Sequence, residues 1–280
     1  SSYDVEACSW SNIPDEDFAL ADDNHWTIGQ FVWTGFDYLG EPSPYDTNAW
    51  PNHSSMFGII DLASIPKDRY YLYRSVWNKK AETLHILPHW TWPGREGKVT
   101  PVFVYTNHPT AELFINGKSY GKQSKNNSSL KNRYRLMWID AVYEPGEIKV
   151  VAYNKDGKAV AEKIVRTAGK PHHIELVSNR NELTADRKDL AYITVKVVDK
   201  DGNLCPADSR QINFSVKGAG KYRAAANGDP TNLEQFHLPK MHTFNGMLTA
   251  IVQSGETAGE IVLTAKASGV KAGNIRIQTK

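Results

Sequence analysis

Short apolar runs separated by turn signals dominate the chain from about Leu84 onward, and they constrain its fold more than any other feature. Residues 116–117 (NG) and 156–157 (DG) are dipeptides typical of hairpin turns, and residues 145–146 (PG) make a third turn. This spacing predicts an antiparallel β-sandwich over residues 81–168. The expected strands cover residues 99–105, 111–115, 118–120, 133–142, 148–153 and 159–165.

A second set of strand patterns follows a linker at residues 167–171 (TAGKP) and predicts another immunoglobulin-like β-sandwich over residues 172–280. Its irregular loop, residues 227–244, is long for a sandwich, and loops of that length are often functional. We interpret Asp229 in this loop as fixing a turn, with cation binding as the alternative. The expected strands cover residues 174–177, 192–198, 212–216, 248–252, 261–267 and 274–278.

Residues 1–80 have a different pattern, which predicts one strand, one long loop and one helix. The strand lies in residues 29–42 (GQFVWTGFDYLGEP), and the helix covers residues 61–77, with Ser64 as its cap and Pro66 in its first turn. Strand, loop and helix form one unit of an α/β architecture, which cannot bury both faces of its strand alone. We therefore interpret this region as the end of a larger structure whose earlier strands are not in this sequence.

Composition excludes several classes of protein. The 280 residues carry a net charge of +2 and 40% hydrophobic residues, which argues against a nucleic-acid surface and against bulk disorder. Cys8 and Cys205 are far apart and predict isolated thiols, no spacing indicates a metal or cofactor, and no run is long enough for a membrane span. The eight Trp and 13 Tyr residues suit sugar binding, although they also suit a packed core. Because the chain starts at Ser1 without an initiator Met, we expect a piece of a longer protein.

Five motifs, in this order, resemble the C-terminal part of glycoside hydrolase family 2 proteins of the β-galactosidase type found in Bacteroides-like bacteria. The resemblance covers nearly the whole chain. The motifs are residues 29–42, residues 67–73 (KDRYYLY) with Trp77, residues 85–94 (HILPHWTWPG), residues 112–119 (ELFINGKS), and residues 227–231 (NGDPT) with residues 244–246 (FNG).

The resemblance implies a mainly β fold, in which two immunoglobulin-like sandwiches follow the last strand-helix unit of a TIM (β/α)8 barrel. Family members hydrolyse β-glycosides with retention, using two carboxylic acids about 5–5.5 Å apart. These are glutamates on earlier barrel strands, so both are expected upstream of Ser1 and no catalytic residue is assigned here. Trp33, at the end of the last strand, is expected to form a wall of the sugar site. Asp37 is expected either to hold the loop or to accept a sugar hydroxyl.

The resemblance also predicts what the parent protein does and where it works. We expect it to hydrolyse a terminal β-linked sugar, as a β-galactosidase would, in the periplasm or outside the cell, and homo-oligomerisation is an open expectation. The 280-residue chain alone is expected to be inactive. His85, His89, Trp90 and Trp92 are interpreted as covering the junction between barrel and sandwich.

Two other hypotheses concern the sandwiches themselves. They could form a carbohydrate-binding module, for which Trp90, Trp92 and Trp138 are the candidate surface aromatics. Alternatively, they only brace the barrel and shape its entrance or an oligomer interface.

Overall fold

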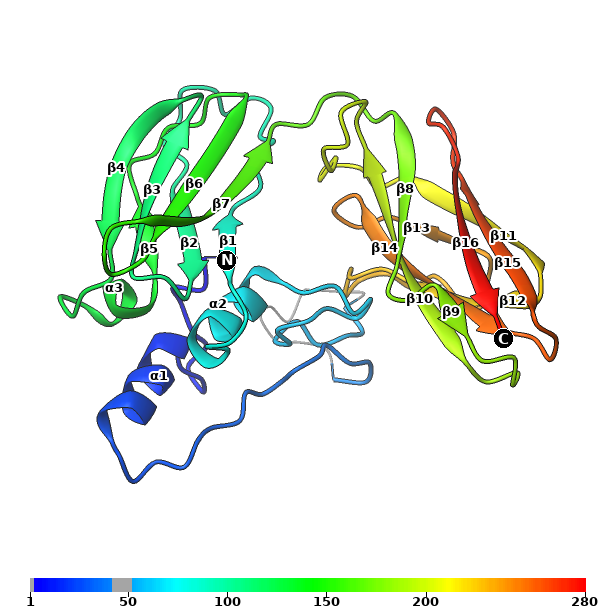
Figure 1. Cartoon of the computed structure of the whole chain (residues 1–280), viewed down its shortest axis with the longest axis horizontal. Coiled ribbons are helices and arrows are strands. Elements are labelled where there is room, and N and C mark those ends of the chain that lie inside the picture. The colour runs from blue at the N-terminus through cyan, green and yellow to red at the C-terminus, as the bar shows by residue number, and fades with distance from the viewer. Residues whose placement is uncertain (1–2, 42–51) are drawn as a thin grey trace. The chain divides into compact units, whose positions relative to one another are not determined.

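The chain forms two compact units, each of which combines two separate stretches of sequence. A computed structural model describes residues 3–41 and 52–280 (Figure 1); Pro42, which ends the first family motif, lies outside them. The first unit comprises Ser1–Gly35 with Pro66–Thr167, and the second comprises Phe36–Ile65 with Ala168–Lys280. The crossing between them at Gly35 lies inside the predicted barrel-strand motif.

In the described part of the first unit, a three-stranded and a four-stranded antiparallel sheet pack as the predicted sandwich. The strand orders are β1-β2-β5 and β4-β3-β6-β7. The elements are α1 (Pro14–Asp23), α2 (Asp68–Trp77), β1 (Leu84–Leu87), β2 (Val102–Thr106), β3 (Thr110–Ile115), β4 (Lys118–Ser124), α3 (Leu130–Tyr134), β5 (Leu136–Trp138), β6 (Glu147–Tyr153) and β7 (Ala159–Arg166).

The alternation of apolar residues sets the core of this sandwich. In β3, Ala111, Leu113 and Ile115 are buried, whereas the residues between them are partly exposed. Asn116 and Gly117 have positive φ angles of 48° and 80°, as a tight hairpin between β3 and β4 requires, so the predicted turn is confirmed.

Two helices pack on the first sandwich, and the sequence predicted one of them. In α1, Phe18 is buried against Tyr73 and Trp77 of α2 and against Tyr134 of α3, with ring centroids 5.0, 6.1 and 5.3 Å apart. The signals for α1, which were missed, are a proline at its start and three acidic residues in its first turn.

The predicted start of the second helix at Asp61 is wrong, because α2 begins at Asp68. The Asp61 carboxylate accepts hydrogen bonds from the backbone N–H groups of Ala63 and Ile65. Ser64 has a positive φ angle of 63°, which helical backbone excludes. Residues 61–65 therefore form a turn, and Pro66 lies before the helix rather than in it.

In the described part of the second unit, a four-stranded and a five-stranded sheet form the second predicted sandwich. Their strand orders are β12-β14-β10-β8 and β13-β11-β15-β16-β9. Its core contains alternating residues from both sheets, for example Ile193 and Val195 of one and Ile261 and Leu263 of the other. The strands are β8 (His173–Ser178), β9 (Glu182–Leu183), β10 (Leu190–Val198), β11 (Gln211–Gly218), β12 (Gly220–Ala226), β13 (Lys240–His242), β14 (Met247–Ser254), β15 (Gly259–Lys266) and β16 (Gly273–Thr279).

Candidate functional site

Trp33, the predicted sugar-binding residue, lies in a stretch of large exposed apolar side chains. Its side chain is 75% exposed, and the peptide bond to Thr34 is cis. Trp26 is exposed to a similar extent, and Ile28 and Phe31 are fully exposed. Residues 31–35 form no strand, because among the described residues no neighbouring strand is present to complete a hydrogen-bonded ladder. Soluble proteins rarely leave so much contiguous apolar surface uncovered unless it is an interface.

Asp37, the other predicted site residue, is buried and takes part in a local backbone network. Its side chain accepts a hydrogen bond from the Gly58 N–H at 2.8 Å, and its own N–H donates to the Ile60 carbonyl at 2.9 Å. Only 6% of Asp37 is exposed. A Cβ atom at Gly58 would lie 2.3 Å from the Asp37 backbone nitrogen, so this approach requires glycine. The geometry makes Asp37 a group that holds the loop together.

The stretch that contains Gly58 is attached to the second sandwich by three contacts. The Thr249 hydroxyl, on β14, donates to the Ala63 carbonyl at 2.7 Å in a buried position. The His53 N–H donates to the Pro230 carbonyl at 3.0 Å. A Cβ atom at Gly228 would lie 2.0 Å from Oδ2 of Asp61, so the Asp61 side chain packs on the Gly228 backbone without room for another side chain. Gly228 and Pro230 lie in the motif at residues 227–231, but the sequence did not indicate Thr249, because nothing in a strand pattern marks it as a contact of residue 63.

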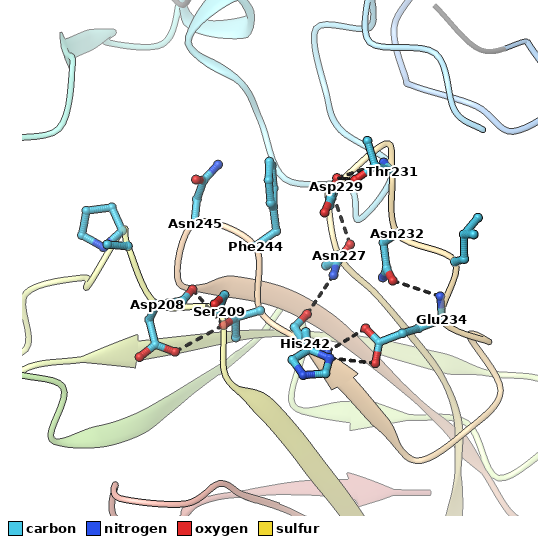
Figure 2. Close-up of a pocket in the computed structure, with 14 residues that line it drawn as sticks. Asp208, Ser209, Asn227, Asp229, Thr231, Asn232, Glu234, His242, Phe244 and Asn245 are labelled. Atoms are coloured by element: carbon cyan, nitrogen blue, oxygen red, sulfur yellow. Dashed lines mark hydrogen bonds and ion pairs between the residues drawn. The ribbon is translucent and has the colours of Figure 1, made fainter. Parts of the chain in front are cut away.

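The predicted functional loop, residues 227–244, lines a hollow of about 710 Å³ in the second unit, together with residues 206–209 and Asn245 (Figure 2). Asp229 accepts hydrogen bonds from the N–H and the hydroxyl of Thr231, so it fixes the turn as predicted. His242 donates its N–H to Glu234, which also lies 3.0 Å from Nδ1 of His242. Phe244, at the end of this loop, and the following Asn245 point the same way (Figure 2).

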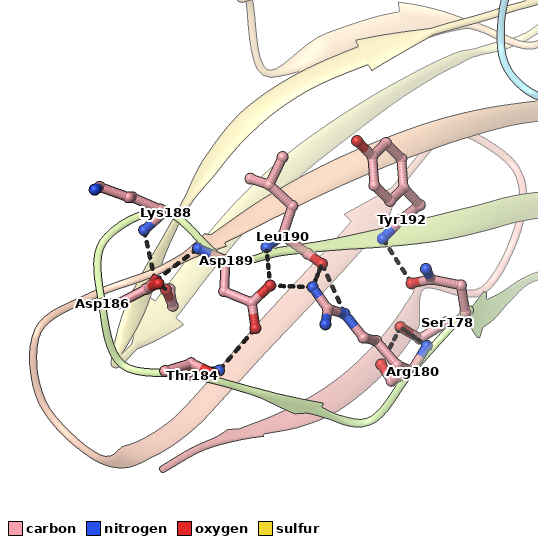
Figure 3. Close-up of polar contacts among 10 residues, drawn as sticks. Ser178, Arg180, Thr184, Asp186, Lys188, Asp189, Leu190 and Tyr192 are labelled. Atoms are coloured by element: carbon pink, nitrogen blue, oxygen red, sulfur yellow. Dashed lines mark hydrogen bonds and ion pairs between the residues drawn. The ribbon is translucent and has the colours of Figure 1, made fainter.

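A second polar cluster of this unit fixes the chain between β8 and β10. The Arg180 guanidinium pairs with the Asp189 carboxylate and donates to the Leu190 carbonyl (Figure 3). The N–H of Thr184 also donates to Asp189, and together these donors lower the pKa of that carboxyl. The cluster provides hydrogen-bond partners for the backbone of this turn, and we assign it no catalytic role.

Two of the aromatic residues considered for a binding surface are buried in the first sandwich. Trp90 is 0% exposed and donates its indole N–H to the Glu144 carbonyl, and Trp138 is 2% exposed. Trp92 is partly exposed and stacks on His89 with ring centroids 4.1 Å apart. The line of surface aromatics considered for a binding module is therefore absent from these three positions, because two of the rings fill the core.

His85 joins the helix α2 to the first strand of the sandwich. Its Nε2 lies 2.6 Å from Oδ1 of Asp68, and its ring stacks on Tyr71 with centroids 3.9 Å apart.

Across residues 3–41 and 52–280, no group of three or more His, Cys, Asp or Glu side chains is arranged to hold a metal ion. Within the same residues, no helix is both long and apolar enough to cross a membrane.

Family models and known proteins match this chain along its length. The model of glycoside hydrolase family 2 C-terminal domain 5 matches residues 174–276, and a domain of unknown function (DUF4982) matches residues 97–161. The β-galactosidase BoGH2A of Bacteroides ovatus is 43% identical over 281 residues, which is 100% of this chain and 32% of the relative. The chain belongs to glycoside hydrolase family 2. The resemblance seen in the sequence is thereby confirmed.

Other family 2 relatives and structures agree with this assignment. A putative β-glucuronidase of Formosa agariphila is 32% identical, over 89% of this chain and 24% of that protein. The crystal structure of a β-glycosidase from Bacteroides vulgatus superposes with a TM-score of 0.89 at 35% identity, covering 99% of this chain and 34% of the other. The chain thus spans about a third or less of these family 2 proteins and corresponds to their C-terminal region.

Proposed function

We propose that this chain is the C-terminal region of a retaining β-glycosidase, specifically a β-galactosidase, that removes terminal β-linked sugars from glycans. The observation that carries the proposal is the 43% identity to a β-galactosidase along the entire chain. Putative β-glucuronidases are also among the relatives, so β-glucuronides are the competing substrate class. The proposal places the two catalytic glutamates upstream of Ser1, and the parent protein in the periplasm or outside the cell, where it could form a homo-oligomer.

The exposed apolar stretch supports a missing barrel. Ile28 and Phe31 are fully exposed, and Trp33 is mostly exposed. In the proposed parent enzyme, residues 31–36 form the last strand of a TIM barrel, whose neighbouring strands cover these side chains. Barrel active sites lie at the carboxyl ends of the strands. Trp33 would then stand at the sugar site, where an indole ring stacks on the apolar face of a sugar. Asp37 follows this strand directly in the sequence. Its proposed role is either to accept a hydrogen bond from a sugar hydroxyl or only to hold the loop.

The sandwiches serve this enzyme as braces in our proposal. Two observations favour bracing over an independent glycan-binding module. Trp90 and Trp138 are core residues, and the segment after the proposed last barrel strand packs on the second sandwich. An array of glycans presented to the 280-residue chain tests the competing module directly.

Turnover of nitrophenyl β-galactoside tests the proposed function. The 280-residue chain is expected to show none, whereas the protein that includes the upstream region hydrolyses the substrate and releases sugar of retained anomeric configuration. In that longer protein, Trp33→Ala is expected to raise KM about fivefold or more, since the loss of stacking on one aromatic ring costs roughly 1–3 kcal/mol. Turnover by the isolated chain, or preference for nitrophenyl β-glucuronide, would contradict the proposal.

A further inference from the structure

The segment that follows Trp33 belongs, from Phe36 onward, to the second compact unit, whereas Trp33 itself belongs to the first. Phe36–Ile65 belongs to the compact unit of Ala168–Lys280, although more than 100 residues separate the two stretches in sequence. Its described residues, 36–41 and 52–65, are therefore placed by the terminal sandwich. The unit boundary falls between Gly35 and Phe36, directly beside the proposed sugar site.

Three contacts attach this segment to the sandwich, and each has a different chemical character. Thr249 supplies a side-chain hydroxyl to the Ala63 carbonyl from 186 residues away. Pro230 supplies a backbone carbonyl to His53. Gly228 permits the close approach because it has no side chain, and any Cβ atom there would overlap the Asp61 carboxylate. Because Thr249 sits in the regular strand β14, the attachment point is rigid.

Hydrogen bonds, together with the peptide bond between Ile60 and Asp61, connect these contacts to Asp37. Asp61 fixes its own turn by accepting the N–H groups of Ala63 and Ile65. The neighbouring Ile60 carbonyl accepts the Asp37 N–H, and Gly58 donates to the Asp37 carboxylate. All of these residues lie in the second unit, so displacing the turn at Asp61 displaces Asp37.

The covalent chain extends this constraint to Trp33. Three residues lie between Trp33 and Asp37, which makes four steps along the chain, so their Cα atoms are no more than about 14 Å apart. Asp37, which belongs to the unit of the terminal sandwich, therefore lies within this distance of the Cα atom of Trp33.

We propose that the terminal sandwich is a positioning element for the substrate site, with Thr249 and Gly228 as its positioning residues. The inference rests on the proposed glycosidase function. It gives the last domain a role in substrate binding through the loop it anchors, without contact between Thr249 or Gly228 and the sugar. Such residues alter KM more than kcat when they are changed, because they set the shape of the binding site rather than the chemistry.

Hydrogen exchange of the 280-residue chain tests the anchor without any activity. Thr249→Val removes the hydroxyl and keeps the shape, whereas Thr249→Ser keeps the hydroxyl. Thr264→Val is the matched control, because the Thr264 hydroxyl donates to the side chain of Asn274 on the neighbouring strand β16. Thr249→Val is expected to speed exchange of the Gly58 and Ile65 amides about two- to tenfold, as expected for one lost hydrogen bond. Thr249→Ser and Thr264→Val are expected to match the wild type. Unchanged exchange in Thr249→Val overturns the anchor.

Kinetics of the longer protein test the positioning role. Gly228→Ala and Thr249→Val are expected to raise KM for nitrophenyl β-galactoside about two- to tenfold with a smaller change in kcat. Gly169→Ala is the control for glycine substitution, because its Cβ would meet only ordinary contacts at 3.5 Å. Faster exchange with an unchanged KM overturns the positioning role. A wild-type longer protein without any glycosidase turnover overturns the proposed function, and the positioning role with it, whereas the exchange result still decides the anchor.

Discussion

At the scale of single residues, the most demanding interaction is a buried ion pair in the first unit. Both Arg135 and Asp15 have fully buried side chains, and Arg135 Nε lies 2.8 Å from Oδ1 of Asp15. The guanidinium also donates to the backbone carbonyls of Tyr3 and Asp4. Burying a charge is costly unless it is paired and hydrogen-bonded, and here each of the three guanidinium nitrogens has an acceptor.

Breaking this pair from one side should be strongly destabilising. Arg135→Met leaves the Asp15 carboxylate buried without its partner, and we expect a loss of about 3–5 kcal/mol in the free energy of unfolding of the first unit. Arg133→Met is the matched control, because the Arg133–Asp23 pair is exposed and such pairs contribute at most about 1 kcal/mol. Urea denaturation of the two variants measures the difference. Equal losses would show that the buried pair has no special role.

At the scale of elements, a single carboxylate stabilises the turn after β10 and the linker before β8. Asp199 accepts hydrogen bonds from the N–H groups of Gly169, Asp201 and Asn203. Burial acts to raise the pKa of Asp199, but these hydrogen bonds outweigh it and lower the pKa to about 2. The charged form is therefore favoured in the folded protein.

The stability contributed by Asp199 should depend on pH in a definite direction. Since the pKa is lowered on folding, the contribution is complete above the unfolded value of about 4 and is lost as the pH falls toward 2. Asp199→Asn is expected to cost about 1–3 kcal/mol at pH 7, through donors left without a charged acceptor. The gap from wild type should narrow between pH 4 and pH 2 in denaturation curves. The exposed Asp201→Asn variant should show no such gap, and a gap that stays constant with pH would contradict the assignment.

Local patterns predicted most strands and failed at particular elements. The positions of β3, β6, β10 and β14 follow from alternation between turn signals. The helix α2 starts seven residues later than predicted, because Ser64 adopts a left-handed backbone conformation in a turn, which a serine in the sequence does not indicate. The short strand β13 gains its place only by pairing with β11, which lies nearly thirty residues earlier in the chain.

At the scale of the whole molecule, the chain divides into two compact units with separate cores. Each unit contains its own sandwich and its own stabilising charged group, Arg135 in the first and Asp199 in the second. Units of this size with their own cores usually unfold cooperatively as individual bodies.

Scanning calorimetry should therefore resolve two unfolding transitions. Arg135→Met is expected to lower the midpoint of one transition by several degrees and leave the other in place, and Asp199→Asn is expected to do the reverse. A single transition that both substitutions shift would contradict the division into two units.

The sequence by itself determined where most strands and the main turns lie along the chain, and it indicated the family, because alternation and turn chemistry act over a few residues and survive as readable patterns. It also marked Trp33 and Asp37 as site candidates. Only the tertiary structure decided that Trp90 and Trp138 lie in the core and that Asp37 is buried with its carboxylate bonded to the Gly58 N–H. It also decided that residues 36–65 belong to the unit of the terminal sandwich. These features depend on contacts such as Thr249 with Ala63, between surfaces that exist only after the strands have assembled. No local pattern encodes such contacts, since Thr249 and Ala63 are 186 residues apart and even Asp37 and Gly58 are 21 residues apart.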